Sequence, residues 1–287
     1  MTGKLEGKIA VITGGASGLG AAGVLAFVNA GAKVVVADIR EPRAEVASSF
    51  GQHVKFKSCD VTREEDVRAL FAFVKSEYGH LDILYNNAGG GSAPASLLDQ
   101  SEAEWDMNMD VMLKSVMLMT KHALPLLIER GGGSVINTAS IAGLRAGIAG
   151  LAYSVSKAAV CHFTRMMVPE LGRHKIRVNS ICPGIIPTPA IGGAFGLSYE
   201  DTIKVIPKVS EIYSEHFPLK VVGKPSHVAE TALFLASDDS AFITGQEISV
   251  DGGLASLGPG ALDTALPGNI VERVVVAISE FKAGADV

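Results

Sequence analysis

The chain has 287 residues, a formal net charge of −5 and 19% charged residues. This length suits one large α/β domain, and no linker or low-complexity segment divides it. The acidic balance leaves no basic footprint for nucleic acid, so a nucleic-acid partner is not expected.

The first predicted unit is a strand, a glycine-rich turn and a helix. Residues 8–13 form a β-branched run, TGGASGLG follows, and an apolar stretch suited to a helix packed on a sheet comes next. Gly14 permits the tight turn, Gly18 lets backbone approach a pyrophosphate, and Gly20 allows close packing. The positive helix N-terminus would hold the phosphate. The candidate cofactor residues of this loop are Gly14, Ser17, Gly18, Leu19 and Gly20.

The uncharged segment 9–32 spans this unit and could be mistaken for a signal or membrane segment. It contains six glycines together with Thr, Ser and Asn. It lacks a continuous apolar core of about 20 residues. We therefore expect no membrane partner.

The second predicted strand, 33–37, ends in Asp38. A carboxylate at this place accepts hydrogen bonds from the adenosine ribose hydroxyls and repels a 2′-phosphate. No Arg or Lys lies between Gly14 and Gly20 to offset that repulsion, although Arg40 is close. The sequence therefore predicts NAD rather than NADP as the cofactor.

Five further strands are predicted at 54–58, 81–86, 133–138, 176–181 and 247–251, alternating with longer helical patterns. This alternation predicts a parallel sheet of about seven strands with helices on both faces, a doubly wound α/β fold. We expect a single domain over residues 1–253, followed by a C-terminal extension over 254–287.

A hydroxyl, a phenol and an amine can meet after the fifth predicted strand. Ser140 follows that strand, and Tyr153 and Lys157 lie four residues apart, which places them on one face of a helix. The Lys157 ammonium would stabilise the Tyr153 phenolate, lowering the phenol pKa from near 10 to about 7. Tyr153 could then act as a general base on an alcohol. A Tyr and a Lys at this spacing also occur on ordinary solvated helices.

Taken together, the motifs resemble the short-chain dehydrogenase/reductase family in their order and spacing. The resemblance covers about residues 5–253 and implies a Rossmann-like fold. The motifs are TGGASGLG, Asp60-Val61, the NNAG of residues 86–89, Ser140, Tyr153, Lys157 and Pro183-Gly184.

The resemblance also implies roles for individual residues. Tyr153 would be the acid/base, Lys157 would hold the nicotinamide ribose and lower the Tyr pKa, and Ser140 would position the substrate oxygen. Hydride transfer itself would belong to the cofactor. The remaining cofactor residues would be Asp60 at the adenine amine with Val61 beside it, Asn86, Ala88 and Gly89 at the adenine ribose, and Pro183, Gly184, Ile186 and Thr188 at the nicotinamide amide.

One position departs from the family pattern. The family has a catalytic Asn in a pattern like DVNLKG, and residues 110–115 read DVMLKS, with Met112 in its place. In the family that Asn lies at a helix kink and helps hold a water of the proton relay, partly through its main-chain carbonyl. The carbonyl survives the substitution, and Asn108, one helical turn earlier, could donate instead. Two hypotheses remain: an NAD-dependent alcohol dehydrogenase, or an NAD-sensing binding protein whose chemistry has decayed.

By the same resemblance, the substrate pocket would draw on residues 90–96, 141–151 and a lid at 187–224. The second segment is almost wholly apolar and the lid is rich in large apolar residues, which favours a bulky hydrophobic secondary alcohol, alicyclic, terpenoid, steroid or aryl, oxidised to its ketone. Arg145 could instead bind a carboxylate, and several lid residues could simply pack the lid on the domain. The lid residues are Ile191, Phe195, Leu197, Tyr199, Ile203, Ile206, Ile212, Tyr213 and Phe217.

The three cysteines, Cys59, Cys161 and Cys182, show neither metal-ligand spacing nor a disulfide framework, and the seven histidines do not cluster. We therefore expect no metal and a reduced, cytoplasmic setting.

Beyond Gly253 the chain reaches an amphipathic pattern at 270–281, with Val271, Val274, Val275 and Ile278 at helical spacing. This segment is either a frayed tail or a helix that docks on a neighbouring subunit. We expect docking, because the resemblance implies a homo-oligomer built through two long helices and the last strand. A tetramer is expected rather than a dimer.

Overall fold

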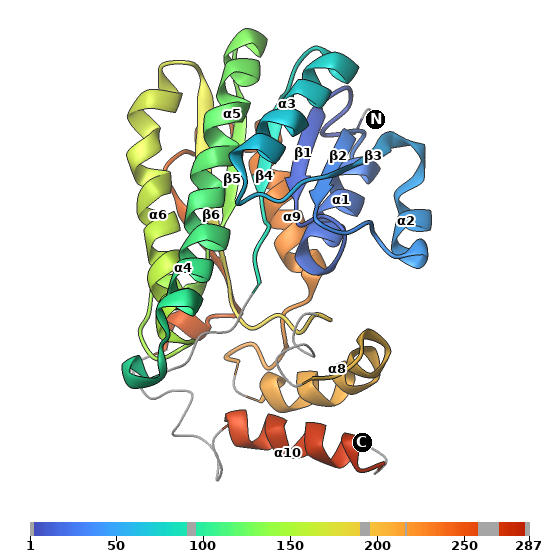
Figure 1. The fold of residues 1–287 in the computed structure, drawn as a ribbon, viewed down its shortest axis with the longest axis vertical. Coiled ribbons are helices and arrows are strands. Elements are labelled where there is room, and N and C mark those ends of the chain that lie inside the picture. The colour runs from blue at the N-terminus through green and yellow to red at the C-terminus, as the bar shows by residue number, and fades with distance from the viewer. Residues whose placement is uncertain (1–2, 91–95, 190–195, 216, 258–269, 285–287) are drawn as a thin grey trace.

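A computed structural model describes residues 3–90, 96–189, 196–215, 217–257 and 270–284. Seven parallel strands form one sheet in the order β3-β2-β1-β4-β5-β6-β7, flanked by helices on both faces (Figure 1). The predicted doubly wound α/β fold is therefore confirmed. The strands are β1 Ile9–Thr13, β2 Lys33–Asp38, β3 Val54–Ser58, β4 Ile83–Asn86, β5 Gly133–Thr138, β6 Ile176–Pro183 and β7 Glu247–Val250.

The central strands are buried on both faces, which is why their sequences read as continuous apolar runs. Successive side chains point to opposite faces of a sheet. Val11 and Leu84 accordingly belong to the core on one face, and Ile12 and Tyr85 to the core on the other.

Each face is covered by its own set of helices. On one face lie α1 Gly18–Asn29, α2 Ala44–Phe50 and α9 Pro225–Ala236, through residues such as Phe27 and Leu235. On the other face lie α3 Glu64–Tyr78, α5 Ser115–Arg130 and α6 Leu151–Gly172. The order of the strands in the sheet reverses between β1 and β4. Sheets of this kind bind ligands in the crevice outside the carboxyl ends of the strands at such a reversal.

Helix α4, Glu102–Met109, joins α5 through a π-helical turn, Asp110–Lys114. By length and composition this continuous segment, Glu102–Arg130, could cross a membrane, yet half of its apolar window is buried inside the protein. Met119 and Leu127 pack in the core beneath the sheet. The segment therefore serves as a packing helix of the α/β core.

Two helices form a separate layer at one end of the molecule (Figure 1). They are α8 Tyr199–Ser214, within the predicted lid, and α10 Ile270–Lys282, in the C-terminal extension. Their shared apolar seam consists of Val205, Val209, Ile212, Val274, Ala277 and Ile278.

The C-terminal extension was expected either to fray or to dock on a neighbouring subunit. In the structure α10 packs on α8 of its own chain, and Arg273 Nη1 lies 2.9 Å from Glu215 Oε2 across the helix pair. Val274 and Ile278 face the seam as the helical spacing predicted, whereas Val275 is 42% exposed. The side chain of Val271 lies outside the described residues.

Candidate active site

The glycine-rich turn between β1 and α1 has the conformation that its sequence requires. Gly14 has φ +64° and Gly18 has φ +55°, both in the left-handed region. A β-carbon on Gly20 would lie 2.1 Å from the Gly14 carbonyl oxygen, so the turn closes only because that atom is absent. Ser17 is the N-cap residue of α1, is exposed, and makes no side-chain capping bond. Leu19 packs against the sheet core.

Two residues that sequence analysis did not single out hold this turn in place. Thr13 Oγ1 accepts hydrogen bonds from the backbone N–H groups of Asn87 at 2.9 Å and Ala88 at 2.8 Å. Asn87 Nδ2 donates to the Thr13 carbonyl at 3.1 Å. The end of β4 is thus tied to the end of β1. The second Asn of the NNAG motif was the available signal.

The preceding residue, Asn86, was assigned to the adenine ribose, and the structure places its side chain elsewhere. It is 4% exposed, and its Nδ2 donates to Asn137 Oδ1 at 2.9 Å. Asn137 Nδ2 in turn donates to Thr164 Oγ1 on α6 at 3.0 Å. Because adjacent side chains of a strand point to opposite faces, Asn86 braces the sheet against α6 while Asn87 faces the turn.

Asp38 lies at the end of β2 with its carboxylate against the glycine turn. Its Oδ2 accepts from the Ala16 N–H at 3.1 Å, and its Oδ1 accepts from the Arg40 N–H at 3.2 Å. The Arg40 side chain is exposed. A negative charge therefore borders the turn where the sequence predicted it.

Asp60 is a second fixed carboxylate, just after β3. Hydrogen bonds from the Thr62 hydroxyl at 2.7 Å and the Thr62 N–H at 2.9 Å lower the pKa of Asp60. Val61, assigned beside it, is 7% exposed and packs in the core. The buried Val61 side chain therefore anchors this segment, and with it Asp60, to the core.

Ser140, Tyr153 and Lys157 converge beyond the carboxyl end of β5. Ser140 caps the short 3₁₀ helix Ile141–Gly143, where its Oγ accepts from the Ala142 N–H at 3.1 Å, and its hydroxyl is near enough to the Tyr153 phenol to affect the phenol pKa. Lys157 is 4% exposed, and its Nζ donates to the Thr138 carbonyl at 2.8 Å. That Nζ lies 5.7 Å from the centre of the Tyr153 ring.

The acid–base balance of the pair differs from the sequence expectation. Burial raises the pKa of Tyr153, and the Ser140 hydrogen bond opposes that rise. Burial also lowers the pKa of Lys157 to about 8. We expected Lys157 to lower the Tyr pKa to about 7. The prediction was wrong for the protein by itself, because the ammonium bonds to the Thr138 carbonyl and desolvation is the largest effect on the phenol.

Met112, in the place of the family Asn, lies in the π-helical turn and belongs to the site. It is 1% exposed, and a β-carbon on Gly89 would lie 3.2 Å from its sulfur and 3.8 Å from Lys157 Nζ. The thioether and the Lys157 ammonium thus both lie near Gly89. Asn108 is buried rather than solvated; its Nδ2 donates to the Glu104 carbonyl at 2.8 Å, and its Oδ1 has no partner among the described residues.

The segment after β6 returns across the site to the glycine turn. A β-carbon on Gly184 would lie 2.8 Å from Asp251 Cβ, so only glycine fits there, and the Gly184 N–H donates to the Val250 carbonyl at 3.0 Å. Pro183 is the buried last residue of β6, and Ile186 packs against the sheet core. A β-carbon on Gly18 would lie 3.7 Å from Thr188 Cβ, which brings the segment over the turn.

The substrate side of the site is lined by an apolar cluster. It joins the segment after β5 to the lid and the start of the C-terminal extension, through Ile141, Leu144, Ile148, Tyr213, Phe217 and Leu254. Phe217 is 1% exposed and packs the lid on the domain, whereas Ile212, 5% exposed, lies in the α8–α10 seam. Arg145 is exposed. Residues 91–95 of the expected pocket, with Ile191 and Phe195, lie outside the described residues.

The described residues fit a dinucleotide. The α1 N-terminus carries no acidic residue in its first turn, the exposed Ser17 hydroxyl lies beside it, and Asp38 borders the turn. Asp60 is held at the end of the neighbouring strand. Across the described part of the chain, no three His, Cys, Asp or Glu side chains are grouped as a metal site requires.

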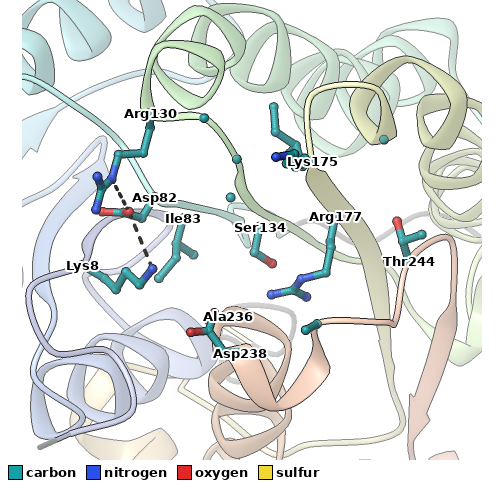
Figure 2. A pocket seen from close by; sticks show the side chains of 16 residues that line it. Lys8, Asp82, Ile83, Arg130, Ser134, Lys175, Arg177, Ala236, Asp238 and Thr244 are labelled. Atoms are coloured by element: carbon teal, nitrogen blue, oxygen red, sulfur yellow. Dashed lines mark hydrogen bonds and ion pairs between the residues drawn. The ribbon is translucent and has the colours of Figure 1, made fainter.

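A hollow of about 480 Å³ lies at the opposite, amino edge of the sheet (Figure 2). Asp82 is at one side of it, with Arg130 Nε at 2.8 Å and Lys8 Nζ at 3.9 Å. Arg177 donates to the Leu235 carbonyl at 2.7 Å and the Ser240 hydroxyl at 2.8 Å. These charges brace the sheet edge, and none of the candidate site residues lines the hollow.

Comparison with known proteins gives relatives along almost the whole chain. A family model described as enoyl-(acyl carrier protein) reductase matches residues 14–255. Short-chain dehydrogenase reductase 3a of Arabidopsis thaliana is 39% identical over 259 residues, which cover 89% of this chain and 98% of that protein. Momilactone A synthase of Oryza sativa subsp. japonica is 40% identical over 257 residues, covering 88% of this chain and 91% of the relative.

A solved structure agrees with the sequence relatives. The crystal structure of a short-chain dehydrogenase/reductase from Burkholderia xenovorans superposes with a TM-score of 0.80 at 32% identity, covering 89% of this chain and 99% of that one.

Proposed function

The chain belongs to the short-chain dehydrogenase/reductase family of oxidoreductases, and on this premise we propose that it interconverts a hydrophobic secondary alcohol and its ketone with NAD. The observation that carries the proposal is the convergence of Ser140, Tyr153 and the buried Lys157 ammonium beside the glycine turn. Hydride transfer would be the chemistry of the nicotinamide when bound. The chain would supply position, charge and a proton.

Tyr153 is the proposed proton carrier, with the Ser140 hydroxyl positioning the substrate oxygen next to it. Because burial raises the Tyr153 pKa, the phenol holds its proton at neutral pH and is ready to donate it to a ketone oxygen. In alcohol oxidation the phenol must first ionise, which positive charge favours. Lys157 has a pKa of about 8 and therefore supplies such a charge at neutral pH.

NAD is the proposed cofactor because Asp38 presents a carboxylate at the glycine turn. Its oxygens accept from the Ala16 and Arg40 N–H groups, which fixes the charge where a ribose 2′-substituent would lie. The Arg43 guanidinium, the next cation along this loop, is ion-paired with Glu200 and lies 4.3 Å from the Tyr199 ring centre. The guanidinium of Arg43 therefore interacts with residues of the lid.

A hydrophobic substrate is proposed from the apolar cluster on the substrate side. Ile141, Leu144 and Ile148 face the lid residues Tyr213 and Phe217 in one cluster. Apolar walls of this kind favour apolar ligands oriented by a few polar groups, here Ser140 and Tyr153. The relatives carry the names momilactone A synthase, tropinone reductase-like 1 and 3-oxoacyl-[acyl-carrier-protein] reductase, so substrates differ within the family.

A second candidate is an NAD-binding protein with little chemistry, favoured by one observation. The side chain that completes the proton relay in the family is replaced by Met112, which packs against Gly89 without a polar group. The enzyme hypothesis is preferred because Ser140, Tyr153 and Lys157 are all present and converge beyond the carboxyl end of β5.

We also propose a cytoplasmic homotetramer. The three cysteines are buried and unbridged, in agreement with a reducing setting. Apolar side chains are exposed on the long helices and before the last strand, where the family resemblance expects subunit contacts: Met107, Met117, Val155, Met166 and Phe242. Sedimentation of the purified protein tests the tetramer, and a monomer at all concentrations would contradict it.

The proposed reaction is tested by following NADH formation by absorbance with a panel of alicyclic, terpenoid, steroid and aryl secondary alcohols. Parallel assays use NADP, primary alcohols, and 3-oxoacyl and enoyl thioesters in the reductive direction. We expect turnover with NAD and at least one hydrophobic secondary alcohol. Turnover confined to thioesters would contradict the substrate class, and tight NAD binding without any turnover would favour the binding protein.

A further inference from the structure

Two cysteines far apart in the sequence meet behind the candidate active site. Cys161 lies on α6 and Cys182 on β6, and their sulfurs are hydrogen-bonded at 3.8 Å. They are 2% and 0% exposed. Both belong to the apolar cluster on the substrate side, whereas Cys59 lies in the core on the far side of the sheet from α1. The spacing of the cysteines along the chain shows neither metal ligands nor a disulfide framework, and it does not reveal this contact.

The thiol pair lies next to the proposed catalytic residues in the fold. Cys161 is one helical turn beyond Lys157 on the same face of α6. The Ser140 backbone N–H is close enough to the Cys182 thiol to oppose the rise in its pKa, and Cys182 directly precedes Pro183 of the segment assigned to the nicotinamide amide. A movement of the two sulfurs would therefore reach Lys157 through one turn of helix and Ser140 through the adjoining end of β6.

We propose that Cys161 and Cys182 are an oxidative modification site, at which a hydroperoxide closes a reversible disulfide that disables the active site. Closing the bond brings the sulfurs from 3.8 Å to about 2.05 Å. The helix and the strand must approach each other, which moves the ends of α6 and β6 that lie next to Lys157 and Ser140.

The chemistry balances with hydrogen peroxide as the oxidant. The Cys161 thiolate attacks one peroxide oxygen, the O–O bond breaks, and the departing hydroxide takes up a proton as water, leaving a sulfenic acid on Cys161. The Cys182 sulfur then attacks the Cys161 sulfur, its proton leaves with the hydroxyl as a second water, and the S–S bond forms. Two thiols lose two electrons and two protons, and one peroxide becomes two waters.

The surroundings assign the order of attack. The hydrogen bond from Cys182 lowers the pKa of Cys161, while that same bond and burial raise the pKa of Cys182. Cys161 is thus the thiol that ionises and meets the oxidant first. Burial raises the pKa of Cys59 to about 12, which makes Cys59 an inert internal control.

Burial of both sulfurs also selects the oxidant. A peroxide is close to water in size, whereas glutathione disulfide and aromatic disulfide reagents are too large to reach a sulfur that is 0–2% exposed. We therefore expect peroxide to close the bond on the folded protein and bulky disulfides to leave it open.

The test treats the purified full-length protein with hydrogen peroxide, alkylates free thiols and maps peptides without reduction. We expect a Cys161–Cys182 linked pair lighter by two hydrogens, with Cys59 alkylated. Turnover and NADH affinity, read by nucleotide fluorescence, should both fall at least about tenfold, as small misplacements of catalytic groups do. Dithiothreitol applied in urea, which opens the fold to this larger reagent, should restore them once the urea is removed. The affinity readout needs no substrate, so it remains valid if the proposed reaction is wrong.

The matched variants separate this site from general oxidation. Cys161→Ser should keep its NADH affinity through peroxide treatment, and Cys182→Ser serves the same purpose if the first variant folds poorly. Cys59→Ser should lose affinity as the wild type does. The proposal is overturned if no linked peptide forms, if the linked protein binds NADH and turns over normally, or if Cys161→Ser is as sensitive to peroxide as the wild type.

Discussion

The floor and the roof of the candidate site are held by different forces. The floor is the carboxyl edge of the sheet, where buried hydrogen bonds fix each group: Thr13 to Asn87, and Lys157 to the Thr138 carbonyl at 2.8 Å. The roof is the α8–α10 pair, held together by one small apolar seam and attached to the domain by the apolar contacts of Tyr213 and by surface ion pairs such as Arg43 to Glu200.

This difference suggests that separate parts of the site serve proton transfer and the choice of substrate. Exposed ion pairs contribute little, typically under about 1 kcal/mol each, and isolated helix pairs open locally at low cost. Buried and mutually satisfied polar groups keep one geometry. Under the proposed function, the floor would therefore carry the proton transfer and the roof would be the part that adapts to a substrate. Five changes test this division.

The largest effect is expected on the floor. Tyr153→Phe keeps the ring but removes the proposed proton carrier, so turnover should fall by about 10²- to 10⁴-fold. NAD affinity, measured by fluorescence titration, should change little because the ring still packs as before. Retention of more than a tenth of the wild-type turnover would remove Tyr153 from the mechanism.

The roof is tested by a matched pair of substitutions on α10. Val274 is 1% exposed in the seam, and Val276 is 54% exposed on the same helix. Val274→Asp places a carboxylate among apolar side chains at a cost of several kcal/mol, on the order of 4 kcal/mol. Hydrogen exchange over 199–214 should accelerate and the substrate KM should rise.

Val276→Asp is the control and should leave exchange and KM unchanged. In both variants NAD affinity should stay within about twofold, because the floor is built without α10. Equal effects of the two substitutions, or a collapse of NAD affinity in Val274→Asp, would break the division between roof and floor.

Lys157→Met should abolish activity and raise the stability of the fold at neutral pH. The folded pKa of about 8 lies below the ordinary 10.5, so below pH 8 the fold holds a buried charge that it disfavours. At about 1.4 kcal/mol per pKa unit the penalty is on the order of 3 kcal/mol, less about 1 kcal/mol for the lost Thr138 hydrogen bond. The variant should therefore be inactive yet more stable at neutral pH.

The pH dependence gives the sign of this effect. Between about pH 8 and 10.5 the unfolded wild type binds a proton that the folded wild type has released, so wild-type stability rises with pH relative to the variant. Urea unfolding of both proteins at about pH 7 and about pH 9.5 measures the change. Stability curves that stay parallel would show that Lys157 is not held in a desolvating site.

Asp38→Ala should shift cofactor choice by about tenfold or more, roughly 1.4 kcal/mol, because it removes the charge that repels a 2′-phosphate. The ratio of kcat/KM values for NADP and NAD should rise. Asp38→Asn retains an oxygen acceptor for the Ala16 N–H, and so separates charge repulsion from the hydrogen bond. An unmoved ratio in both variants, or a wild type that already prefers NADP, would contradict the assignment.

The smallest effect is expected at the position that departs from the family. If the relay depends on the main-chain carbonyl of residue 112, Met112→Asn should change turnover less than about threefold, roughly 0.6 kcal/mol. Asn108→Ala, measured alongside across pH, shows whether the buried amide substitutes for the missing side chain. A tenfold gain in Met112→Asn would overturn the carbonyl account, and an inert Asn108→Ala would dismiss compensation.

The sequence was informative where local pattern decides the structure. Apolar runs located all seven strands to within a few residues; β6 extends to Pro183 because Pro183 pairs with Val250 on β7. The tight turn at Gly14 and the close packing at Gly20 followed from the glycine pattern in its strand–turn–helix context. These features depend on residues that are close together in the chain.

The features that the sequence did not predict depend on how helices and strands pack against one another. The amphipathic pattern of α10 identified its apolar face, but not that α8 covers it. Spacing placed Lys157 on the same helix face as Tyr153. The direction in which the pKa of the Tyr153 phenol shifts is set by burial, which only the assembled fold determines. The meeting of Cys161 with Cys182 likewise comes from helix and strand packing. The alternation of side chains along a strand predicts that Asn86 and Asn87 point to opposite faces of the sheet, as they do in the structure.

The most direct test of the central claim follows the hydride. A secondary alcohol accepted in the NADH assay is deuterated at its carbinol carbon, and the nucleotide product is analysed by mass spectrometry for wild type and for Tyr153→Phe. We expect one deuterium in the NADH formed by the wild type, appearing about 10²-fold more slowly or less in the variant. Unlabelled NADH, or label that appears equally fast in Tyr153→Phe, would contradict hydride transfer governed by this site.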